Sequence, residues 1–270
     1  MNETLRVALL QMRQIQKDCR ANLATVESAF GQLPPGTELA VLPEMWITGF
    51  MTSKGELDRT LLRESFEAGR ETMSRLSRTY HTALYGSLIE PLEEEEGRLY
   101  NSGLFYDPSG ELIGYYPKHQ LFGPGGERDY FKAGDRRVQI AYGGFQIRLA
   151  VCYDLRFPVW LRQDESLGLY DLLLVCANWP EPRQDHWQTL LRARAIENQA
   201  YVAAANRIGP GPGSLTYPGL SALLDGWGKE IHAGDNRAEG WLTAELKRSA
   251  LSRLRTVFPV LDTLDHFRLR

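Results

Sequence analysis

The sequence contains few cysteines and no long apolar run. Only three of its 270 residues are cysteines, Cys19, Cys152 and Cys176, and no two of them form a C-x-x-C pair. This pattern disfavours a disulfide framework and a structural zinc site, so we expect a cytoplasmic protein without a metal or cofactor. No apolar segment approaches the roughly 20 residues that a membrane span requires, and no signal peptide is expected at the N-terminus.

An excess of positive charge is also absent. The formal net charge is -3, which disfavours nucleic acid as a partner, because phosphate binding requires a basic face. A composition of 43% hydrophobic and 24% charged residues is typical of a globular protein. Because no linker, internal repeat or low-complexity tract divides the chain, we interpret residues 1–270 as a single domain.

The spacing of apolar residues predicts an α/β fold. Short apolar runs between turn residues predict strands, and apolar residues at helical spacing predict helices. We expect strands at residues 6–12, 39–42, 83–89, 100–106, 112–116, 138–141, 145–151, 172–176, 201–206, 220–224, 230–232 and 240–244, and helices at residues 22–33, 62–80, 184–198 and 247–255. Because hairpins interrupt the alternation of strands and helices, at least one sheet is expected to be mixed.

Several segments lack this periodicity. Residues 93–96 are acidic and predict a solvated loop tip, and the Gly/Pro-rich residues 208–213 predict another loop. Residues 117–134 form a long segment of glycines, polar residues and aromatics, and such long loops tend to be functional. The aromatic and charged tail at residues 258–270 is compatible with crossing to a second subunit and equally with docking on its own domain.

The segment LAVCYDLRFPVW, residues 149–160, has the pattern of a nucleophile elbow. An apolar strand ends at Cys152, polar residues follow at once, and Pro158 suits the first turn of a helix. A sharp turn between strand and helix would hold the thiol above the edge of a sheet. The pattern alone is equally compatible with a buried core thiol, because free cysteines are among the most buried residues.

Two other predicted strands end in an abrupt polar residue. Glu44 follows LAVLP, and Asn178 follows LLLVCA. Ligands bind beyond the carboxyl ends of strands in α/β sheets, so these residues can meet Cys152 in one crevice. Lys118 lies after an aromatic-proline corner at the head of the long loop. Glu44 and Lys118, taken alone, are also compatible with ordinary solvated positions.

A histidine base is an alternative. His119 and His186 are the candidates for a Cys–His pair, and the residues alone leave this arrangement open. Cys176 lies inside an unbroken apolar strand and is interpreted as a core residue. Nothing around Cys19 suggests an activated thiol.

Three sequence blocks together resemble the motifs of the nitrilase, or carbon–nitrogen hydrolase, superfamily. The blocks LPEMWITGF, YPKHQLF and VCYDLRFPVW occur in the family's order, and the resemblance extends through ANWP, RAIENQAYV and GLSALLDGWGKEI. The omega-amidase branch, which acts on 2-oxoglutaramate and similar ω-amides, is the most similar. The resemblance implies a four-layer αββα sandwich with two mixed β-sheets, and a homodimer or higher homo-oligomer.

The resemblance also implies roles for individual residues. Cys152 matches the nucleophile, Glu44 the general base and Lys118 the third catalytic residue. Glu127, in GGERDYFKAG, matches a further glutamate that steadies the lysine and the substrate. The backbone N–H of Tyr153, together with Lys118, would stabilise the oxyanion.

An ω-amide with a carboxylate at its far end requires a cation in the binding site. Arg156 is the first candidate, with Arg128 and Arg183 behind it, because a guanidinium can bind a carboxylate with two hydrogen bonds. The alternative for Arg156 is an ion pair with Asp154 that only shapes the elbow. The further substrate-binding candidates are Trp179 and Phe122, as apolar walls, and Asn178.

The sequence therefore predicts a thiol amidase that releases ammonia from a small ω-amide acid through a cysteine thioester. Another amidase of the superfamily, acting on deaminated glutathione or N-carbamoyl compounds, is the nearest alternative. A catalytically silent binding protein on the same fold is a third, although such a protein has no need of Glu44, Lys118 and Cys152 together.

Overall fold

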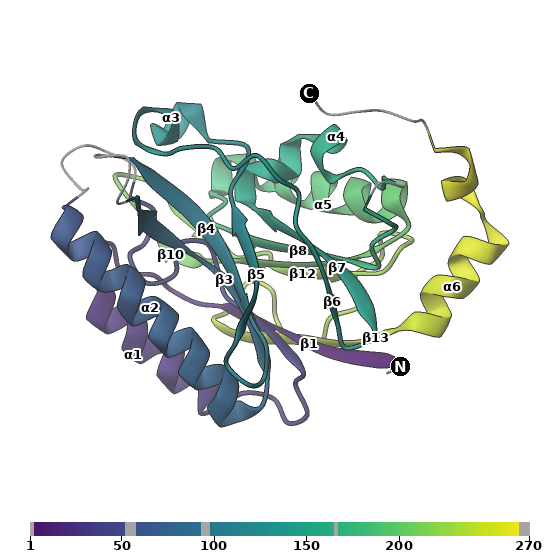
Figure 1. The fold of residues 1–270 in the computed structure, drawn as a ribbon, viewed down its shortest axis with the longest axis horizontal. Coiled ribbons are helices and arrows are strands. Elements are labelled where there is room, and N and C mark those ends of the chain that lie inside the picture. The colour runs from purple at the N-terminus through teal and green to yellow at the C-terminus, as the bar shows by residue number, and fades with distance from the viewer. Residues whose placement is uncertain (1–2, 52–57, 93–97, 165–166, 265–270) are drawn as a thin grey trace.

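Two β-sheets packed face to face form the centre of the molecule (Figure 1). The computed structural model describes residues 3–51, 58–92, 98–164 and 167–264. The first sheet has the strand order β13-β1-β2-β3-β4-β5, and the second has the order β12-β9-β8-β7-β6. A separate two-stranded ribbon pairs β10 with β11.

Both sheets contain parallel strands in the middle and antiparallel strands at the edges. In the first sheet β1, β2 and β3 are parallel, and in the second β7, β8 and β9 are parallel. The strands are β1 (Thr4–Gln11), β2 (Leu39–Val41), β3 (Ala83–Pro91), β4 (Leu99–Tyr106), β5 (Leu112–Pro117), β6 (Gln139–Tyr142), β7 (Phe145–Val151), β8 (Leu172–Ala177), β9 (Tyr201–Asn206), β10 (Ile208–Pro210), β11 (Thr216–Pro218), β12 (Ala222–Leu224) and β13 (Gly240–Lys247).

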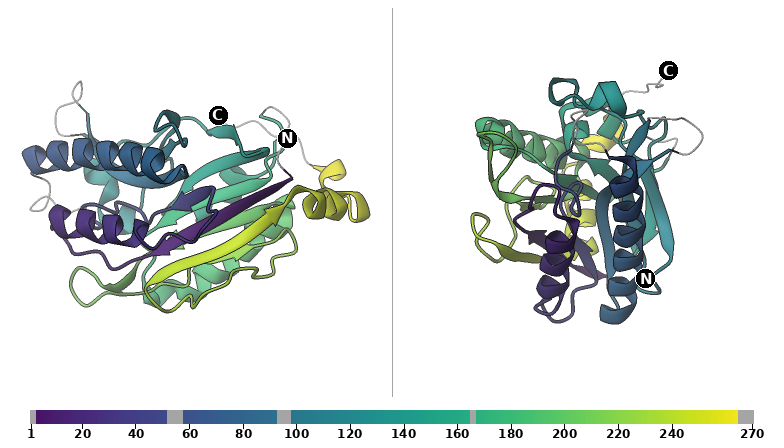
Figure 2. Two further views of the ribbon diagram at one scale, coloured as in Figure 1. Left: turned by 90° about the horizontal axis from the view of Figure 1, so that it is seen from below. Right: turned by 90° about the vertical axis from the view of Figure 1, so that its left-hand side faces the viewer.

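Helices cover the outer face of each sheet. The helices are α1 (Cys19–Phe30), α2 (Arg59–Tyr80), α3 (Glu127–Tyr130), α4 (Pro158–Leu161), α5 (Gln184–Asn198) and α6 (Arg248–Val257). Helices α1 and α2 lie side by side on the first sheet, and α5 covers the second, as the two rotated views show (Figure 2). The αββα sandwich with two mixed sheets that the family resemblance implied is therefore confirmed.

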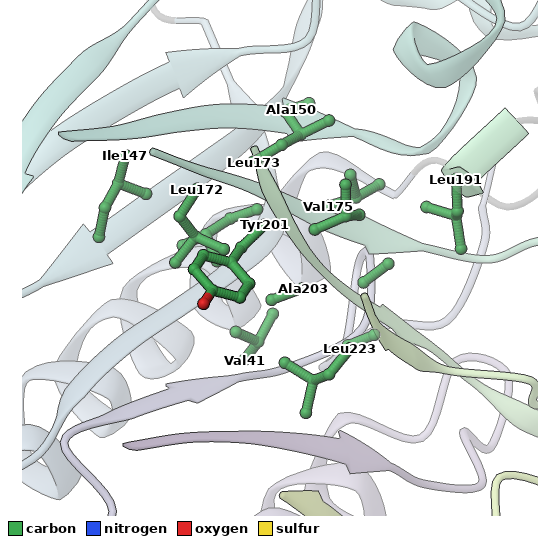
Figure 3. Packing of buried hydrophobic residues seen from close by; sticks show 14 of the residues in the cluster. Val41, Ile147, Ala150, Leu172, Leu173, Val175, Leu191, Tyr201, Ala203 and Leu223 are labelled. Atoms are coloured by element: carbon green, nitrogen blue, oxygen red, sulfur yellow. The ribbon is translucent and has the colours of Figure 1, made fainter. Parts of the chain in front are cut away.

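The alternation of side chains along the strands explains this layering. In β2, Leu39 and Val41 join the core cluster between the sheets, whereas Ala40 packs in the cluster beneath α1 and α2. Figure 3 shows Val41 close to Ala203 of β9 and Leu223 of β12, two strands of the opposite sheet. Both faces of the central strands are buried, which is why these strands are apolar throughout.

The structure departs from the predicted elements in a few segments. Residues 208–210 form β10 rather than part of a loop, and residue 230 makes only an isolated bridge where a strand was expected. The irregular segment at residues 117–134 contains a 3₁₀ helix and α3. The predicted loop tip at residues 93–96 and the end of the tail, residues 265–270, lie outside the described residues. In the part of the chain that is described, no helix is long and apolar enough to cross a membrane.

The tight core predicts a large stability loss for truncation in β8. Leu174 is 0% exposed within the main core cluster, so Leu174→Ala is expected to lower the free energy of unfolding by about 2–5 kcal/mol. Leu112→Ala is the matched control at a site that is 39% exposed, and its effect should stay below about 0.5 kcal/mol. Denaturant titration followed by circular dichroism measures both. Equal effects of the two substitutions would contradict this view of the core.

Candidate active site

The ends of four strands meet at one edge of the sandwich. Glu44 follows β2, Lys118 follows β5, Cys152 follows β7 and Asn178 follows β8. The backbone N–H of Glu44 donates to the carbonyl of Ala177 over 3.4 Å, which joins the two sheets at this edge. The structure thus brings Glu44, Lys118 and Cys152 together from positions far apart in the sequence.

A buried cluster of three charges occupies this edge. The Lys118 ammonium donates to Glu44 Oε1 over 2.8 Å and to Glu127 Oε1 over 2.9 Å, and all three side chains are 0% exposed. Burial acts to lower the pKa of Lys118, but the charges of Glu127 and Glu44 outweigh it and raise the pKa well above its usual range. Lys118 therefore remains a cation beside two carboxylates.

Glu127 is held from two sides. Its Oε1 accepts from Lys118, and its Oε2 accepts from the backbone N–H of Phe122 over 2.5 Å. Burial and the neighbouring charge of Glu44 raise the pKa of Glu127, while Lys118 opposes that shift. Glu127 thus lies in direct contact with Lys118, the residue that it was expected to steady.

Asn101 is a member of the cluster that the sequence analysis missed. Its side-chain Nδ2 donates to Glu44 Oε1 over 2.8 Å and lies 3.3 Å from Glu127 Oε1. Its backbone carbonyl accepts from the N–H of Lys118 over 2.8 Å. The sequence does contain one indication of this role, which is the position of Asn101 in β4. Asn101 lies on the same face of the strand as the core residue Phe105, and a polar side chain is unusual on such a face.

The backbone at Cys152 has the conformation of an elbow. Its φ angle is +43°, in the left-handed region that residues other than glycine rarely adopt. A 3₁₀ helix, Cys152–Arg156, begins at this residue, and α4 follows it. The N–H of Tyr153 belongs to the first turn of the 3₁₀ helix, where N–H groups have no partner within the helix.

Asp154 fastens the elbow to its surroundings. Its carboxylate accepts from the backbone N–H groups of Val151 over 2.9 Å and Gln120 over 2.8 Å, and from the Tyr116 hydroxyl over 2.7 Å. Asp154 thus ties the cysteine turn to the segment that carries Lys118. The alternative of an ion pair between Asp154 and Arg156 is wrong, because these three neutral donors occupy the carboxylate.

The thiol of Cys152 lies in a buried and negatively charged environment. Burial and then the charge of Glu44 raise its pKa well above the usual range, although Lys118 and the backbone N–H of Asn178 oppose the shift. The same N–H of Asn178 donates to Glu44 Oε2 over 2.8 Å. Because the thiol is protonated at neutral pH, an attack by its sulfur requires a base nearby.

Asn178 supports Glu44 in a second way. Its side-chain Nδ2 donates to the backbone carbonyl of Glu44 over 2.8 Å, and Gln14 Nε2 donates to the same carbonyl over 3.0 Å. Asn178 also lines the cavity described below, and its Oδ1 is buried without a hydrogen-bond partner in the described part of the chain. This residue therefore shapes the turn at Glu44 in addition to facing the cavity.

A cavity of about 430 Å³ opens over Cys152. Aromatic and apolar side chains form most of its wall, and Arg156 and Arg183 are the arginines among them. Its lining residues are Phe50, Lys118, Phe122, Pro124, Gly125, Cys152, Tyr153, Arg156, Asn178, Trp179, Pro180, Arg183, Pro212, Leu215 and Tyr217. The size and the balance of apolar walls with few charges suit a small-molecule site.

The two arginines of the cavity lie over aromatic rings. The Arg156 guanidinium lies 4.6 Å from the Trp179 ring centroid, and the Arg183 guanidinium lies 5.4 Å from that of Phe122. In the described ranges, neither arginine forms an ion pair with a carboxylate. Arg128, the third candidate, is exposed and is not among the cavity-lining residues.

The remaining candidates have other contacts. His119 Nδ1 lies 2.6 Å from the carbonyl oxygen of Gly134, and the ring of His119 stacks on Trp160. His186 Nδ1 contacts the Arg156 guanidinium at 3.2 Å. Cys176 is buried in β8, as the apolar strand predicted. Among the residues that the structure describes, no group of three or more His, Cys, Asp and Glu side chains could hold a metal ion.

Comparison with known proteins places this geometry in a family. The sequence model of the carbon-nitrogen hydrolase family matches residues 6–256. The omega-amidase YafV of Escherichia coli (strain K12) is 37% identical over 265 residues, 98% of each protein. The 2-oxoglutaramate amidase of Bacillus subtilis (strain 168) is 32% identical over 227 residues, 84% of this chain and 85% of that protein.

A solved structure agrees with these matches. The crystal structure of XC1258 from Xanthomonas campestris, a CN-hydrolase superfamily protein with an arsenic adduct in the active site, has a TM-score of 0.86 and 32% identity, and the match covers 99% of both chains. The resemblance inferred from the three motif blocks is therefore confirmed. The chain belongs to the carbon–nitrogen hydrolase family of enzymes.

Proposed function

We propose that this enzyme is an ω-amidase that hydrolyses a small ω-amide acid, of the 2-oxoglutaramate or succinamate type, to the dicarboxylate and ammonia. The observation that carries the proposal is that Cys152 lines one cavity together with Lys118, the partner of Glu44, and with two arginines that have no carboxylate partner in the described ranges. The names of the Escherichia coli and Bacillus subtilis relatives support this substrate class.

The first half of the reaction forms a thioester. Cys152 Sγ attacks the amide carbonyl carbon while its proton passes to Glu44, because the raised pKa of the thiol keeps that proton bound until a base accepts it. The ammonium of Lys118 and the N–H of Tyr153 stabilise the negative charge on the carbonyl oxygen. Glu44 then gives the proton to the leaving nitrogen, the C–N bond breaks and ammonia departs.

The second half of the reaction hydrolyses the thioester. Glu44 takes a proton from a water molecule, and the hydroxyl attacks the thioester carbon. The C–S bond breaks, Cys152 recovers the proton, and the carboxylic acid leaves. Lys118 serves both halves, because its high pKa keeps it protonated while Glu44 cycles between its two forms.

The arginines account for the preference for an acid. A substrate whose amide carbon reaches Cys152 extends its far end into a cavity lined by Arg156 and Arg183. Both guanidinium groups are held over aromatic rings, which orients them without neutralising their charge. Arg156 is the first candidate to bind the carboxylate, and Trp179 and Phe122 form the apolar walls between the two ends of the substrate.

Removal of the thiol tests the chemistry. Cys152→Ala is expected to lower the rate of ammonia release by at least about 10³-fold, because no other group in the site can form the thioester. The assay follows ammonia from 2-oxoglutaramate and succinamate, with deaminated glutathione and an N-carbamoyl amino acid as competing substrates. Cys19→Ser, in α1, is the control and should retain full activity. Full activity of Cys152→Ala would refute the mechanism, and a preference for a competing substrate would refute the proposed branch.

Neutralisation of Arg156 tests the substrate anchor. Arg156→Gln should lower kcat/KM for succinamate by about 10–100-fold, since a hydrogen bond to a charged group contributes about 1.5–3 kcal/mol. The kcat/KM for butyramide, which lacks the carboxylate, should change less than threefold. Arg183→Gln, compared in the same way, identifies any second contact, and Arg128→Gln is the control outside the cavity. An equal loss with both amides would contradict an anchor for the carboxylate.

We further propose a cytoplasmic homodimer. Exposed apolar side chains gather where α5 meets α6: Ile196, Trp227, Val257 and Phe258. Trp227 and Phe258 stack on each other and are 53% and 54% exposed. We call these four residues the α5–α6 patch, and a second copy of the chain is the occupant proposed for it, with the tail from residue 258 onward contributing. Three free cysteines agree with a reducing compartment.

A charged residue in the α5–α6 patch should separate the subunits. The wild-type protein is expected to be dimeric at micromolar concentration, and Trp227→Glu should be monomeric, because burying an unpaired carboxylate opposes association. Light scattering after size-exclusion chromatography gives the mass directly. Ile113→Glu introduces the same charge at a 40% exposed apolar position of β5 and should remain dimeric. A monomeric wild-type protein would contradict the proposal.

A further inference from the structure

We propose that Asn101 is a positioning residue of the active site, which orients Glu44 towards Cys152 and allows the carboxylates of Glu44 and Glu127 to remain ionised together beside one ammonium. The proposal rests on the proposed function, in which Glu44 is the base. Asn101 is thus a buried residue without a charge that joins the three charged residues Glu44, Lys118 and Glu127.

The contacts of Asn101 are directed at both carboxylates. One side-chain nitrogen lies 2.8 Å from Glu44 Oε1 and 3.3 Å from Glu127 Oε1, and Asn101 is 0% exposed. The nitrogen must face these oxygens, because the amide oxygen would be repelled by two acceptors at that place. The amide oxygen itself is buried with no hydrogen-bond partner in the described part of the chain, so the carboxylates are what fix the side chain.

The charge balance of the cluster explains why a neutral donor is needed. Lys118 supplies one positive charge, and Glu44 and Glu127 supply two negative charges in a site without exposure. Two buried carboxylates close together favour protonation of one of them. The Asn101 amide offers two hydrogens to the oxygens that Lys118 also binds, and it lowers this tendency without adding a charge. A second cation in this place would instead cancel the remaining negative charge of the cluster and so weaken Glu44 as a base.

The same contact fixes the direction of Glu44. Its Oε1 is bound by Lys118 and Asn101, and its Oε2 accepts from the N–H of Asn178, which also interacts with Cys152. Two donors on Oε1 and one on Oε2 fix the plane of the carboxylate, and the donor on Oε2 is the N–H that Glu44 shares with the thiol. Asn101 does not line the cavity, so it acts on the substrate only through the charged residues that it contacts, Glu44 first among them.

The experiment compares Asn101→Ala and Asn101→Asp with the wild-type protein. The readout is the rate of Cys152 alkylation by iodoacetamide between pH 5 and 9, followed by mass spectrometry, which needs no knowledge of the substrate. Ser102→Ala is the matched control: Ser102 is the next residue in β4, equally buried, and its hydroxyl binds Glu90 away from the site.

Asn101→Ala should lower the alkylation rate about tenfold at its plateau. Loss of a donor to a carboxylate favours the protonated form, so the acid limb of the pH profile should move up by about one pH unit. Ser102→Ala should leave the profile unchanged. On a substrate that the wild-type protein hydrolyses, Asn101→Ala should lower kcat about tenfold and leave KM unchanged.

Asn101→Asp provides a rescue at low pH. The introduced carboxyl lies beside two carboxylates and is protonated at low pH, where its O–H can replace the amide donor. Its folded-state pKa is therefore raised, so the stability it supports is present at low pH and lost as pH rises. The alkylation rate relative to wild type should fall about tenfold or more between pH 5 and 8, and the melting temperature should fall with it.

Two results would overturn the proposal. The first is a pH profile of Cys152 alkylation in folded Asn101→Ala that matches the wild-type profile. The second is an alkylation rate of Asn101→Asp, relative to the wild-type rate, that stays constant with pH. If Asn101→Ala does not fold, the isosteric Asn101→Asp at pH 5 decides the question. Failure of the proposed function has a different signature: the wild-type protein would release no ammonia from any ω-amide, whatever the alkylation rates.

Discussion

The buried contact between Lys118 and two carboxylates is the interaction on which the active site depends. A lone ammonium at 0% exposure would lose its proton, and a lone buried carboxylate would gain one. Together, Lys118, Glu44 and Glu127 keep an ammonium and its two carboxylate partners in a place from which water is largely excluded. The Asn101 amide and the backbone N–H of Asn178 help to hold these groups in place, because both donate to the Glu44 carboxylate.

The fold makes this contact possible because the strand ends of two sheets meet at one edge. Glu44 and Lys118 extend from the first sheet, whereas Cys152 and Asn178 extend from the second. The proposed base and the proposed nucleophile therefore belong to different layers, and the packing between the layers sets the distance between them. The hydrogen bond from Tyr85 to the carbonyl of Ala150 is one of the polar links that hold the sheets in register.

Much of the fold could be predicted from the sequence, because most strands and helices have clear local periodicity; α5 and β9 have the predicted bounds. The strand β10 was missed because Gly209 and Pro210 are typical of loops. Asn101 was missed for a different reason: its partners lie 57 and 26 residues away, after β2 and in α3, and only the tertiary fold brings them together. The error on Asp154 has the same origin, since Gln120 and Tyr116 reach it from 34 and 38 residues away.

The positive φ of Cys152 has a cost in stability. A side chain in the left-handed region costs the fold roughly 1–2 kcal/mol, which glycine would recover. Met45, next to Glu44, has a φ of +44° and carries the same burden. For Met45, which is 0% exposed in a core cluster, the burial of the side chain outweighs this cost, whereas Cys152 is retained at its strained position by the proposed chemistry of its thiol. The elbow therefore uses a small part of the stability that the packed core supplies to hold a thiol in a conformation that an ordinary turn would give to glycine.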